Sequence, residues 1–240
     1  MRFEKTRVMN FDGALRGMRN PLNSGSQSDS AWEDLKDYIS RLPNDNNIHY
    51  ERKYIIGKAD MNLAQRLIKA GSEHRKFMRQ IFVCVDITAP LYWWKEFDTY
   101  KVATVRNSCS TMHKIHSKPF EINDFAHDSI SEVDINIIDQ FDNTLIALEN
   151  LRQHFNETKD KKYWKALIQM LPDGYEMKAT VTFNYETLLG MCSKGQRRNH
   201  KLNEWSGKDN PNVANFISWA KQLPYSQEFI FLDELEKDSN

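Results

Sequence analysis

A basic turn near the C-terminal end of the chain carries side chains that could bind a phosphate group. It contains Arg197, Arg198, His200 and Lys201 within the run GQRRNHK. An arginine guanidinium presents a planar fork of N–H donors that matches a phosphate. The sequence therefore predicts a site for one nucleotide phosphate here, although a solvated turn without a ligand explains the same residues equally well.

A second candidate region runs from residue 72 to residue 116 and combines polar side chains with aromatic rings. Tyr92, Trp93 and Trp94 are consecutive, and the polar run RNSCST follows at 106–111. Small-molecule pockets have aromatic walls and a few placed polar groups. The region therefore predicts a pocket, whereas a core strand and helix with ordinary caps is the plainer interpretation, which composition slightly favours.

A glycine near the N-terminus suggests a third place where an anion could bind. Gly17 lies in the run RGMRNP, between Arg16 and Arg19. A glycine beside arginines allows the backbone to approach an anion closely. A plain turn is the alternative interpretation of the same run.

Familiar catalytic motifs are absent from the sequence. There is no GxSxG, HExxH, GxxxxGK(S/T) or GxGxxG motif. No glycine occurs between Gly71 and Gly174, which excludes a glycine-rich phosphate loop in the middle of the chain. His113 and His116 are three residues apart, but no carboxylate or cysteine lies at a matching spacing. The sequence therefore predicts no metal site and identifies no catalytic residue.

The composition is typical of a globular protein without a charge bias. The chain has 240 residues, 40% of them hydrophobic, and its 33 basic side chains balance 33 acidic ones. General nucleic-acid binders normally carry a basic excess, so the sequence does not predict that class. We expect a single domain over residues 1–240, because no linker interrupts the chain.

Cysteine usage and hydropathy predict a cytoplasmic protein. Cys84, Cys109 and Cys192 are far apart and form no CxxC pair, so we expect free, buried thiols in a reducing compartment. The N-terminus has no apolar signal region, and no apolar run approaches the length that spans a membrane. We therefore expect no membrane partner.

Hydrophobic periodicity and turn residues predict the order of helices and strands. A long amphipathic helix is expected from about 132 to 155, with an apolar stripe that forms core or a subunit interface. The other expected helices lie at 32–42, 60–71, 161–170, 185–191 and 211–223. The second of them is expected to begin at a capping Asp60. A strand at 81–85 is expected to lead to a helix with Pro90 in its first turn.

A further strand is expected at 176–184, because apolar residues alternate there with polar ones. The predicted buried face of this strand consists of Met177, Ala179, Val181 and Phe183. The acidic tail at 230–240 is expected to be solvated.

The order of elements and several short motifs resemble the flavin-dependent thymidylate synthases, also called thymidylate synthase complementing proteins. The run EHRKF at 73–77 matches a family segment of the form EHxxF that precedes a strand. Towards the C-terminus the family has an Asn that opens a helix, an Arg near its end, and then a His before Trp and Glu. Asn184, then Arg197 or Arg198, and then His200 look like that order.

The run YKVATVRNSCSTMH at 100–113 is similar to the family signature RHRxxSxNxxSxRY. Asn107 and Ser110 fall on the Asn and the second Ser of the signature. The signature is altered at three places: RHR is replaced by Tyr100-Lys101-Val102, the first Ser by Val105, and the final Arg-Tyr by Met112-His113. Lys101 and Arg106 are the cations that could stand in for the missing arginines, although a lysine is not geometrically equivalent.

The resemblance covers residues 55–223. It leaves residues 1–50 as a family-variable N-terminal part, in which the run RGMRNPL is similar to phage and mobile-element relatives of the family. The resemblance implies an α+β fold, in which helices, including the long central amphipathic helix, flank an antiparallel sheet. It also implies a homo-oligomer, either a dimer or a tetramer.

The resemblance implies the reductive methylation of dUMP to dTMP, with FAD as cofactor and methylenetetrahydrofolate and NADPH as co-substrates. In such enzymes the flavin supplies the hydride, while the protein mostly binds and orients the reactants. The residues implied at the cofactor are His74, Arg75, Lys101, Asn107 and Asn184. Those implied at the substrate nucleotide are Arg106, Ser110, Arg197, Arg198 and His200.

Two other functions remain open from the sequence. The altered signature is compatible with a catalytically silent nucleotide-binding protein on the same fold, such as a phage protein that sequesters a signalling nucleotide. A base stacked on Tyr92, Trp93 or Trp94 would then supply affinity. An interaction protein, with the long helix as its interface, is the third possibility. The element order spans most of the chain, which places the enzyme slightly ahead.

Overall fold

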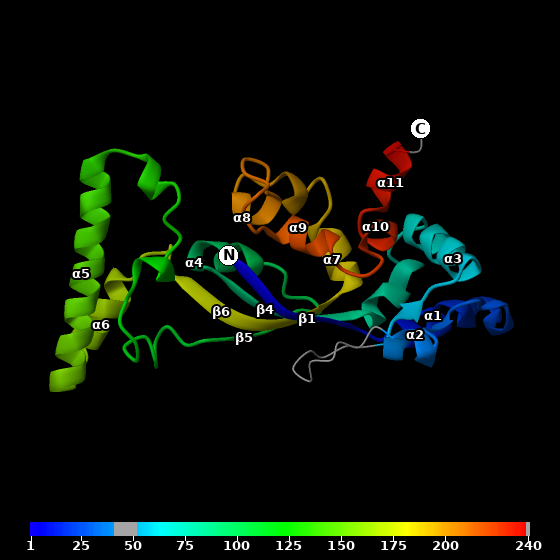
Figure 1. The fold of residues 1–240 in the computed structure, drawn as a ribbon, viewed down its shortest axis with the longest axis horizontal. Coiled ribbons are helices and arrows are strands. Elements are labelled where there is room, and N and C mark those ends of the chain that lie inside the picture. The colour runs from blue at the N-terminus through cyan, green and yellow to red at the C-terminus, as the bar shows by residue number, and fades with distance from the viewer. Residues whose placement is uncertain (41–51, 239–240) are drawn as a thin grey trace. The chain divides into compact units, whose positions relative to one another are not determined.

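The computed structural model describes residues 1–40 and 52–238, which form two compact units (Figure 1). The first unit contains residues 1–6 and 85–181, and the second contains residues 7–84 and 182–240. The expectation of a single domain over 1–240 stays a prediction.

The main sheet has four strands in the order β1-β4-β6-β5: Arg2–Met9, Phe82–Pro90, Glu176–Asn184 and Val105–Ser108. The central strands β4 and β6 are antiparallel. The N–H of Leu91 donates to the carbonyl of Tyr175, and the N–H of Tyr185 donates to the carbonyl of Ile81, both at 3.0 Å. The expected α+β class with an antiparallel sheet is thus confirmed.

Strand β6 has the predicted bounds, and its predicted face is buried. The side chains of that face are at most 7% exposed: Met177, Ala179, Val181 and Phe183. Strand β4 is longer than the predicted segment 81–85, and it is buried on both faces from Val85 onward. A strand covered on both faces reads as a continuous apolar run rather than as an alternation, so its end is hard to place from the sequence.

The first unit also contains a helical part. Its helices are α4, α5 and α6: Leu91–Phe97, Ile135–Thr158 and Lys161–Met170. Short 3-10 turns at Ile122–Asp124 and Ile130–Glu132 precede α5. The predicted bounds of α6 are confirmed, and the long helix is shifted by three residues because Asp134 caps its N-terminus by accepting from the N–H of Asn136.

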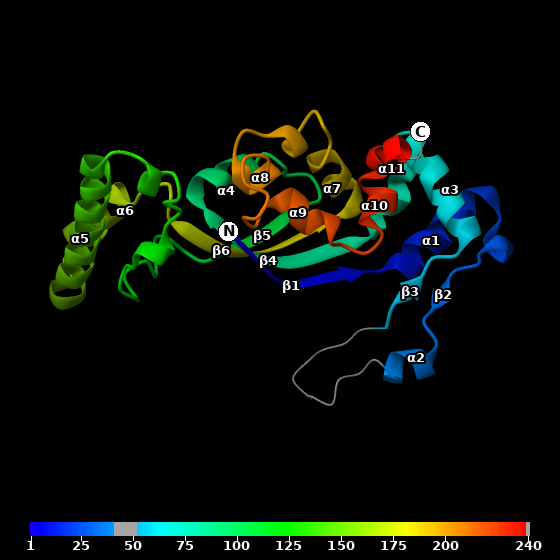
Figure 2. The same ribbon diagram turned by 45° about the horizontal axis from the view of Figure 1, so that its top comes forward.

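Helices α5 and α6 lie side by side as an antiparallel pair (Figures 1 and 2). Leu148 of α5 and Leu167 of α6 are completely buried in one cluster with Ile115 and Phe125. The apolar stripe of the long helix therefore packs in part against its own unit. This packing confirms the core half of the sequence prediction, and the interface half stays a prediction.

The second unit consists mostly of helices. Its helices are α1, α2, α3, α7, α8, α9, α10 and α11: Phe11–Arg19, Leu35–Ser40, Lys58–Lys69, Tyr185–Met191, Asn203–Ser206, Phe216–Lys221, Ser226–Phe229 and Leu232–Asp238. Short 3-10 turns lie at Asn20–Leu22, Gly25–Gln27, Arg75–Gln80 and Arg197–Asn199. Strands β2 and β3, Ala31–Trp32 and Tyr54–Ile55, form an antiparallel pair that leads to α2 (Figure 2).

Of three predicted helices of this unit, two are confirmed only in part and one is confirmed in full. The helix expected at 32–42 begins at Leu35, because residues 31–32 form β2, and Leu42 lies outside the described residues. The helix expected at 211–223 is limited to 216–221, since Asn215 caps it by accepting from the N–H of Ser218. The bounds of α7 are confirmed.

The capping role expected for Asp60 is wrong. Helix α3 begins two residues earlier, and its first turn is capped from outside by Asp29, whose carboxylate accepts from the N–H groups of Ala59 and Asp60. The side chain of Asp60 is instead completely buried against the guanidinium of Arg19. A buried carboxylate requires such a partner.

Both interpretations of the run around Gly17 are also wrong. Gly17 lies inside α1, and a Cβ atom at this position would come within 2.9 Å of Oε1 of Gln80. The glycine therefore allows close packing of α1 on the 75–80 turn rather than the approach of an anion.

The cysteines are free, as predicted, but only Cys192 is buried. Cys84 is half-buried and Cys109 is exposed. Within residues 1–40 and 52–238, none of the helices combines the length and apolar character that a membrane-spanning segment requires.

Candidate functional site

Arg106 is the most distinctive candidate side chain of the first unit. Strand β5 positions it, and its guanidinium lies over the ring of Trp94, 4.9 Å from the ring centroid. Its Nη2 atom forms an ion pair with Asp98 at 3.1 Å. Its Nη1 atom is buried, and no acceptor for it lies in the described part of the chain. The structure thus fixes the plane of this guanidinium and leaves one buried donor unsatisfied.

The neighbours of Arg106 on the altered signature are exposed. Asn107 belongs to β5, whereas Lys101 lies in the loop between α4 and β5. Ser110 follows the strand, and its hydroxyl oxygen accepts from the N–H groups of Met112 and His113 at 3.2 and 2.8 Å. Ser110 therefore stabilises the turn after β5, and its O–H remains a possible donor.

Trp93 and Trp94 are core residues of this chain. They are 0% and 2% exposed, and both pack against Phe97. The indole N–H of Trp94 donates to the carbonyl of Met177 at 2.9 Å. The plainer interpretation of these aromatic residues is therefore right for the two tryptophans, which offer no exposed ring face for a base, while Tyr92 is half-buried.

The basic turn of the second unit is more completely paired than its sequence suggests. Arg198 donates from Nε to the carbonyl of Cys192 at 2.7 Å. Its Nη1 lies 2.9 Å from both carboxylate oxygens of Asp233 and 3.2 Å from Glu234. The guanidinium also lies over the ring of Phe231, 5.0 Å from the centroid. A phosphate that reached Arg198 would have to displace these carboxylates.

Helix α11 supplies the acidic partners of this turn. The first residues of the acidic tail, which was expected to be solvated, therefore contact the turn. Lys194 pairs with Asp233 at 3.0 Å, and Lys221 pairs with Glu234 at 2.8 Å. Burial acts to raise the pKa of Asp233, but hydrogen bonds from Lys194 and Arg198 outweigh burial and hold the pKa below its ordinary value.

The two remaining candidates of the turn pack on one buried indole. Arg197 is 8% exposed, and its guanidinium lies 4.7 Å from the centroid of Trp205. His200 also contacts Trp205, and its Nδ1 accepts from the N–H of Leu202 at 3.1 Å. The structure therefore brings Arg197 and His200 together on Trp205.

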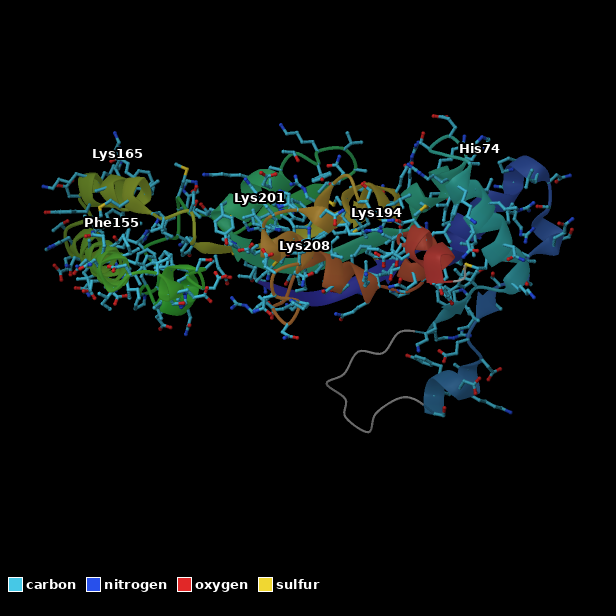
Figure 3. All side chains as sticks on the ribbon, turned by 90° about the horizontal axis from the view of Figure 1, so that it is seen from above. His74, Phe155, Lys165, Lys194, Lys201 and Lys208 are labelled. Carbon is cyan, nitrogen blue, oxygen red and sulfur yellow. The ribbon has the colours of Figure 1, made fainter. Side chains whose placement is uncertain are left out.

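The other candidates of the second unit do not lie at the basic turn. His74 is exposed at the start of the 75–80 turn and lies well apart from Lys201 in Figure 3. Arg75 donates to Glu186 at 3.3 Å, and Arg79 binds the same carboxylate. Asn184 is 4% exposed and caps α7, because its Oδ1 accepts from the N–H of Thr187 at 2.9 Å. The structure thus gives Arg75 and Asn184 clear structural roles.

Sequence reasoning missed the acidic partners of these cations. The sequence predicts Asp233 to be part of a solvated tail, and it singles out neither Asp98 nor Glu186 as a partner of an arginine. Only their negative charge could have signalled them, since Asp233 lies 35 residues from Arg198. Within residues 1–40 and 52–238, no group of three or more His, Cys, Asp or Glu side chains is placed to hold a metal ion.

Comparison by sequence identifies no relative. A scan against protein-family models matches no family, and a search of curated proteins finds no match. Comparison by structure gives a different result, because folds persist after sequence similarity has been lost.

Several solved structures match nearly the whole chain. A flavin-dependent thymidylate synthase from Helicobacter pylori, complexed with FAD and dUMP, has a TM-score of 0.63 at 16% identity and covers 97% of this chain and 99% of its own. A second structure of that enzyme with FAD and dUMP has a TM-score of 0.59 at 14% identity, with 95% of each chain covered.

A UMP/dUMP methylase from Streptomyces cacaoi, bound with 5-Br dUMP, has a TM-score of 0.55 at 13% identity and covers 96% of this chain and 94% of its own. Identities this low establish the fold and not the reaction. The chain therefore has the fold of the flavin-dependent thymidylate synthases.

Proposed function

We propose that this protein binds dUMP and, together with FAD, methylates it to dTMP. Methylenetetrahydrofolate would serve as the carbon donor and NADPH as the reductant. The fold, shared over almost the full length with proteins crystallised with dUMP, supports this proposal. We further propose that the protein is cytoplasmic and works as a homo-oligomer, a dimer or a tetramer.

The observation that carries the proposal is the unsatisfied donor of Arg106. Trp94 and Asp98 hold the guanidinium in place, while Nη1 is buried and has no acceptor among residues 1–40 and 52–238. A buried unpaired N–H is costly, about 1–3 kcal/mol, and an anionic oxygen satisfies it best. We therefore assign the dUMP phosphate to Arg106, with Ser110 as a further donor at the end of the same strand.

In the second unit, the residues that we propose to bind the nucleotide are Arg197, Arg198 and His200. Arg197 and His200 are held against Trp205, which fixes their positions before a ligand arrives. Fixed side chains lose little entropy on binding, which favours affinity. Arg198 takes part only if the nucleotide displaces Asp233.

The residues proposed for FAD fit an anionic cofactor in part. Lys101, His74 and Asn107 are all exposed, so each can be reached by a ligand. Arg75 and Asn184 already bind Glu186 and Thr187, so they would hold FAD through their remaining donors. FAD, when bound and reduced, would supply the hydride, while the chain's own residues would bind and orient the nucleotide.

A catalytically silent nucleotide-binding protein is the second candidate function. Lys101 stands where the family signature has arginine-rich RHR, and the pairing of Arg198 with Asp233 removes a further arginine from easy reach of a ligand. On this alternative, a phage protein that sequesters a signalling nucleotide would keep the fold and Arg106 but would bind no flavin.

The visible absorption spectrum of the concentrated protein, recorded after incubation with excess FAD and desalting, separates the two functions. We expect a retained flavin band and dUMP-dependent oxidation of NADPH in the presence of methylenetetrahydrofolate. A colourless protein that still binds dUMP in a calorimetric titration would support the silent alternative. A protein that binds neither FAD nor dUMP would rule out both.

A further inference from the structure

His116 of the first unit is fixed in place by contacts to its ring and to its backbone. Its imidazole packs edge-on against the ring of Phe155 of helix α5, with 4.8 Å between the ring centroids (Figure 3). Its carbonyl accepts from Nδ2 of Asn156 at 3.1 Å and from Nη1 of Arg152 at 3.4 Å. The loop after β5 therefore holds this imidazole at one place on the C-terminal part of α5.

The two ring nitrogens of His116 have different surroundings. Nδ1 is buried, and no hydrogen-bond partner for it lies within residues 1–40 and 52–238. The side chain as a whole is only half-buried, so Nε2 is the nitrogen that solvent reaches. A proton on Nδ1 would be a buried donor without an acceptor, which favours the tautomer with its proton on Nε2. The imidazole thus presents an N–H donor that a ligand can reach.

Two lysine side chains lie beside this imidazole. Nζ of Lys159 is 5.8 Å from the centroid of the Phe155 ring, so Lys159 and His116 share that ring. Lys114 precedes His116 by two residues in the same loop, and both lysines are exposed. The fold therefore brings two ammonium groups from distant parts of the sequence to one exposed place.

The electrostatic field at the imidazole is positive. Burial lowers the pKa of His116 below its ordinary value. Lys159 and Lys114 lower this pKa further, and Arg152 contributes least. Both carboxylate oxygens of Glu149 bind Arg152, at 2.6 and 2.7 Å, so the charge of this arginine is largely compensated. The two lysines therefore supply most of the field that an approaching anion meets.

An N–H donor between two ammonium groups is suited to a phosphate group. Phosphate oxygens form charge-assisted hydrogen bonds, and lysine binds phosphate as a mobile point charge. The fixed imidazole supplies the directional donor that two flexible lysines lack. Since the ring is held in place before a ligand arrives, its hydrogen bond costs little conformational entropy.

We propose that His116, Lys114 and Lys159 form an anion site that binds the phosphate group of a phosphomonoester. Nε2 of His116 donates to one phosphate oxygen, and the two lysines neutralise the charge of the group. The site shares no residue with the positions assigned to dUMP and FAD. It goes beyond the proposed function in giving the first unit a separate binding activity.

An NMR titration of the full chain with sodium sulfate, at pH 7 and constant ionic strength, tests the proposal. Sulfate is a tetrahedral dianion like a phosphate group, and it keeps its charge while histidine titrates. We expect the imidazole resonance of His116, assigned by its absence in His116→Gln, to shift saturably. The pKa of this imidazole is expected to rise with sulfate, because an anion favours the charged ring. No saturable shift at about 100 mM sulfate would overturn the proposal.

The double variant Lys114→Gln/Lys159→Gln is expected to bind sulfate at least about tenfold more weakly, because both ammonium groups are lost. Its circular dichroism spectrum is expected to stay unchanged, since both side chains are exposed. The matched control is Lys161→Gln/Lys165→Gln, which removes two charges from exposed positions of the neighbouring helix α6. Its affinity is expected to stay within about twofold of the unchanged protein. An equal loss in the control would overturn the proposal.

Three further titrations identify the ligand class and separate this site from the proposed dUMP site. Methyl phosphate, a simple phosphomonoester, is expected to shift the same resonance, whereas Arg106→Gln is expected to leave the response to sulfate unchanged. Failure of this site and failure of the dUMP site are therefore distinguishable. A single-stranded oligonucleotide that binds more tightly than sulfate, and that both lysine double variants weaken equally, would show a nucleic-acid surface and would overturn the proposal.

Discussion

Arg106 and Arg198 differ in how completely their guanidinium groups are paired. Both lie over an aromatic ring, Trp94 for Arg106 and Phe231 for Arg198, and both bind a carboxylate. Arg198 also donates to a backbone carbonyl and meets two carboxylates. Within the described part of the chain, Arg106 forms an ion pair with Asp98 and keeps a buried donor that has no acceptor.

This difference separates an arginine that holds the fold together from one that is ready for a ligand. A guanidinium has five N–H donors, so its capacity for a ligand depends on how many of them the protein already uses. Arg198 ties α11 to the basic turn, whereas Arg106 is held rigidly and remains unsatisfied. Charge and residue type are the same in the two places, and only the partners distinguish them.

The largest effect is expected for Arg198→Gln. The variant loses the hydrogen bond to the carbonyl of Cys192 and the partly exposed ion pairs with Asp233 and Glu234, so we expect the free energy of unfolding to fall by about 2 kcal/mol. Urea denaturation followed by tryptophan fluorescence measures this change. A loss below about 1 kcal/mol is what an exposed ion pair contributes. It would mean that Arg198 does not stabilise the fold more than Arg106 does.

Arg106→Gln is expected to weaken dUMP binding and to change stability only slightly. The affinity for dUMP should fall at least about tenfold, corresponding to about 1.4 kcal/mol, because the proposed phosphate contact is lost. The free energy of unfolding should change by less than about 1 kcal/mol, since the orphaned donor is removed together with the ion pair. Calorimetric titration and urea denaturation measure the two quantities.

The matched control for this variant is Arg2→Gln in the same unit, where Arg2 has an exposed side chain that pairs loosely with Glu176 at 3.7 Å. It should leave dUMP affinity unchanged. An equal loss of affinity in both variants would mean that overall charge, and not the fixed guanidinium of Arg106, determines binding.

The pH dependence of stability tests how much the carboxylate partner of Arg198, Asp233, contributes to the fold. The pKa of Asp233 is held below its ordinary value of 3.8 in the folded protein, so its carboxylate stabilises the fold above that value. This contribution is lost as the pH falls through the lowered pKa. The difference in unfolding free energy between the unchanged protein and Asp233→Asn should therefore be full at pH 7 and should narrow below about pH 4.

The same variant also tests whether Arg198 reaches a ligand. If Arg198 only holds α11, Asp233→Asn leaves dUMP affinity within about twofold, which is the outcome that the pairing predicts. A clear rise in affinity would show that Asp233 competes with the phosphate for Arg198, and it would contradict the contrast drawn between the two arginines.

The first and last residues of some elements could be predicted from the sequence, because neighbouring residues alone determine where these elements begin and end. Strand β6 and helices α6 and α7 have the expected bounds, because alternation and turn residues mark both of their ends. Helix α9 is shorter than expected, since its cap at Asn215 lies inside an apolar pattern that continues on both sides. Asp60 was misassigned because its partner Arg19 is 41 residues away.

For the candidate site, the sequence predicts which types of residue are present but not which partners they contact. The sequence places arginines at 106, 197 and 198, but it does not show which carboxylate each one meets. Those partners come from the tertiary fold, as the contact between Arg198 and Asp233 illustrates. Likewise, nothing local distinguishes the buried rings of Trp93 and Trp94 from exposed stacking surfaces. The availability of a donor is therefore a property of the fold.

The smallest effect is expected at Ser110, the neighbour of Arg106 in the proposed phosphate site. Its oxygen accepts two backbone N–H groups, so its O–H points to another acceptor, for which the phosphate is our proposal. Ser110→Ala should lower the unfolding free energy by about 0.5 kcal/mol and dUMP affinity by about threefold. The control Ser117→Ala removes an exposed hydroxyl that donates to the carbonyl of Lys114, and it should change stability alone. If Ser110→Ala leaves dUMP affinity unchanged while Arg106→Gln reduces it, the phosphate contacts Arg106 but not Ser110. Ser110 then only stabilises the turn after β5.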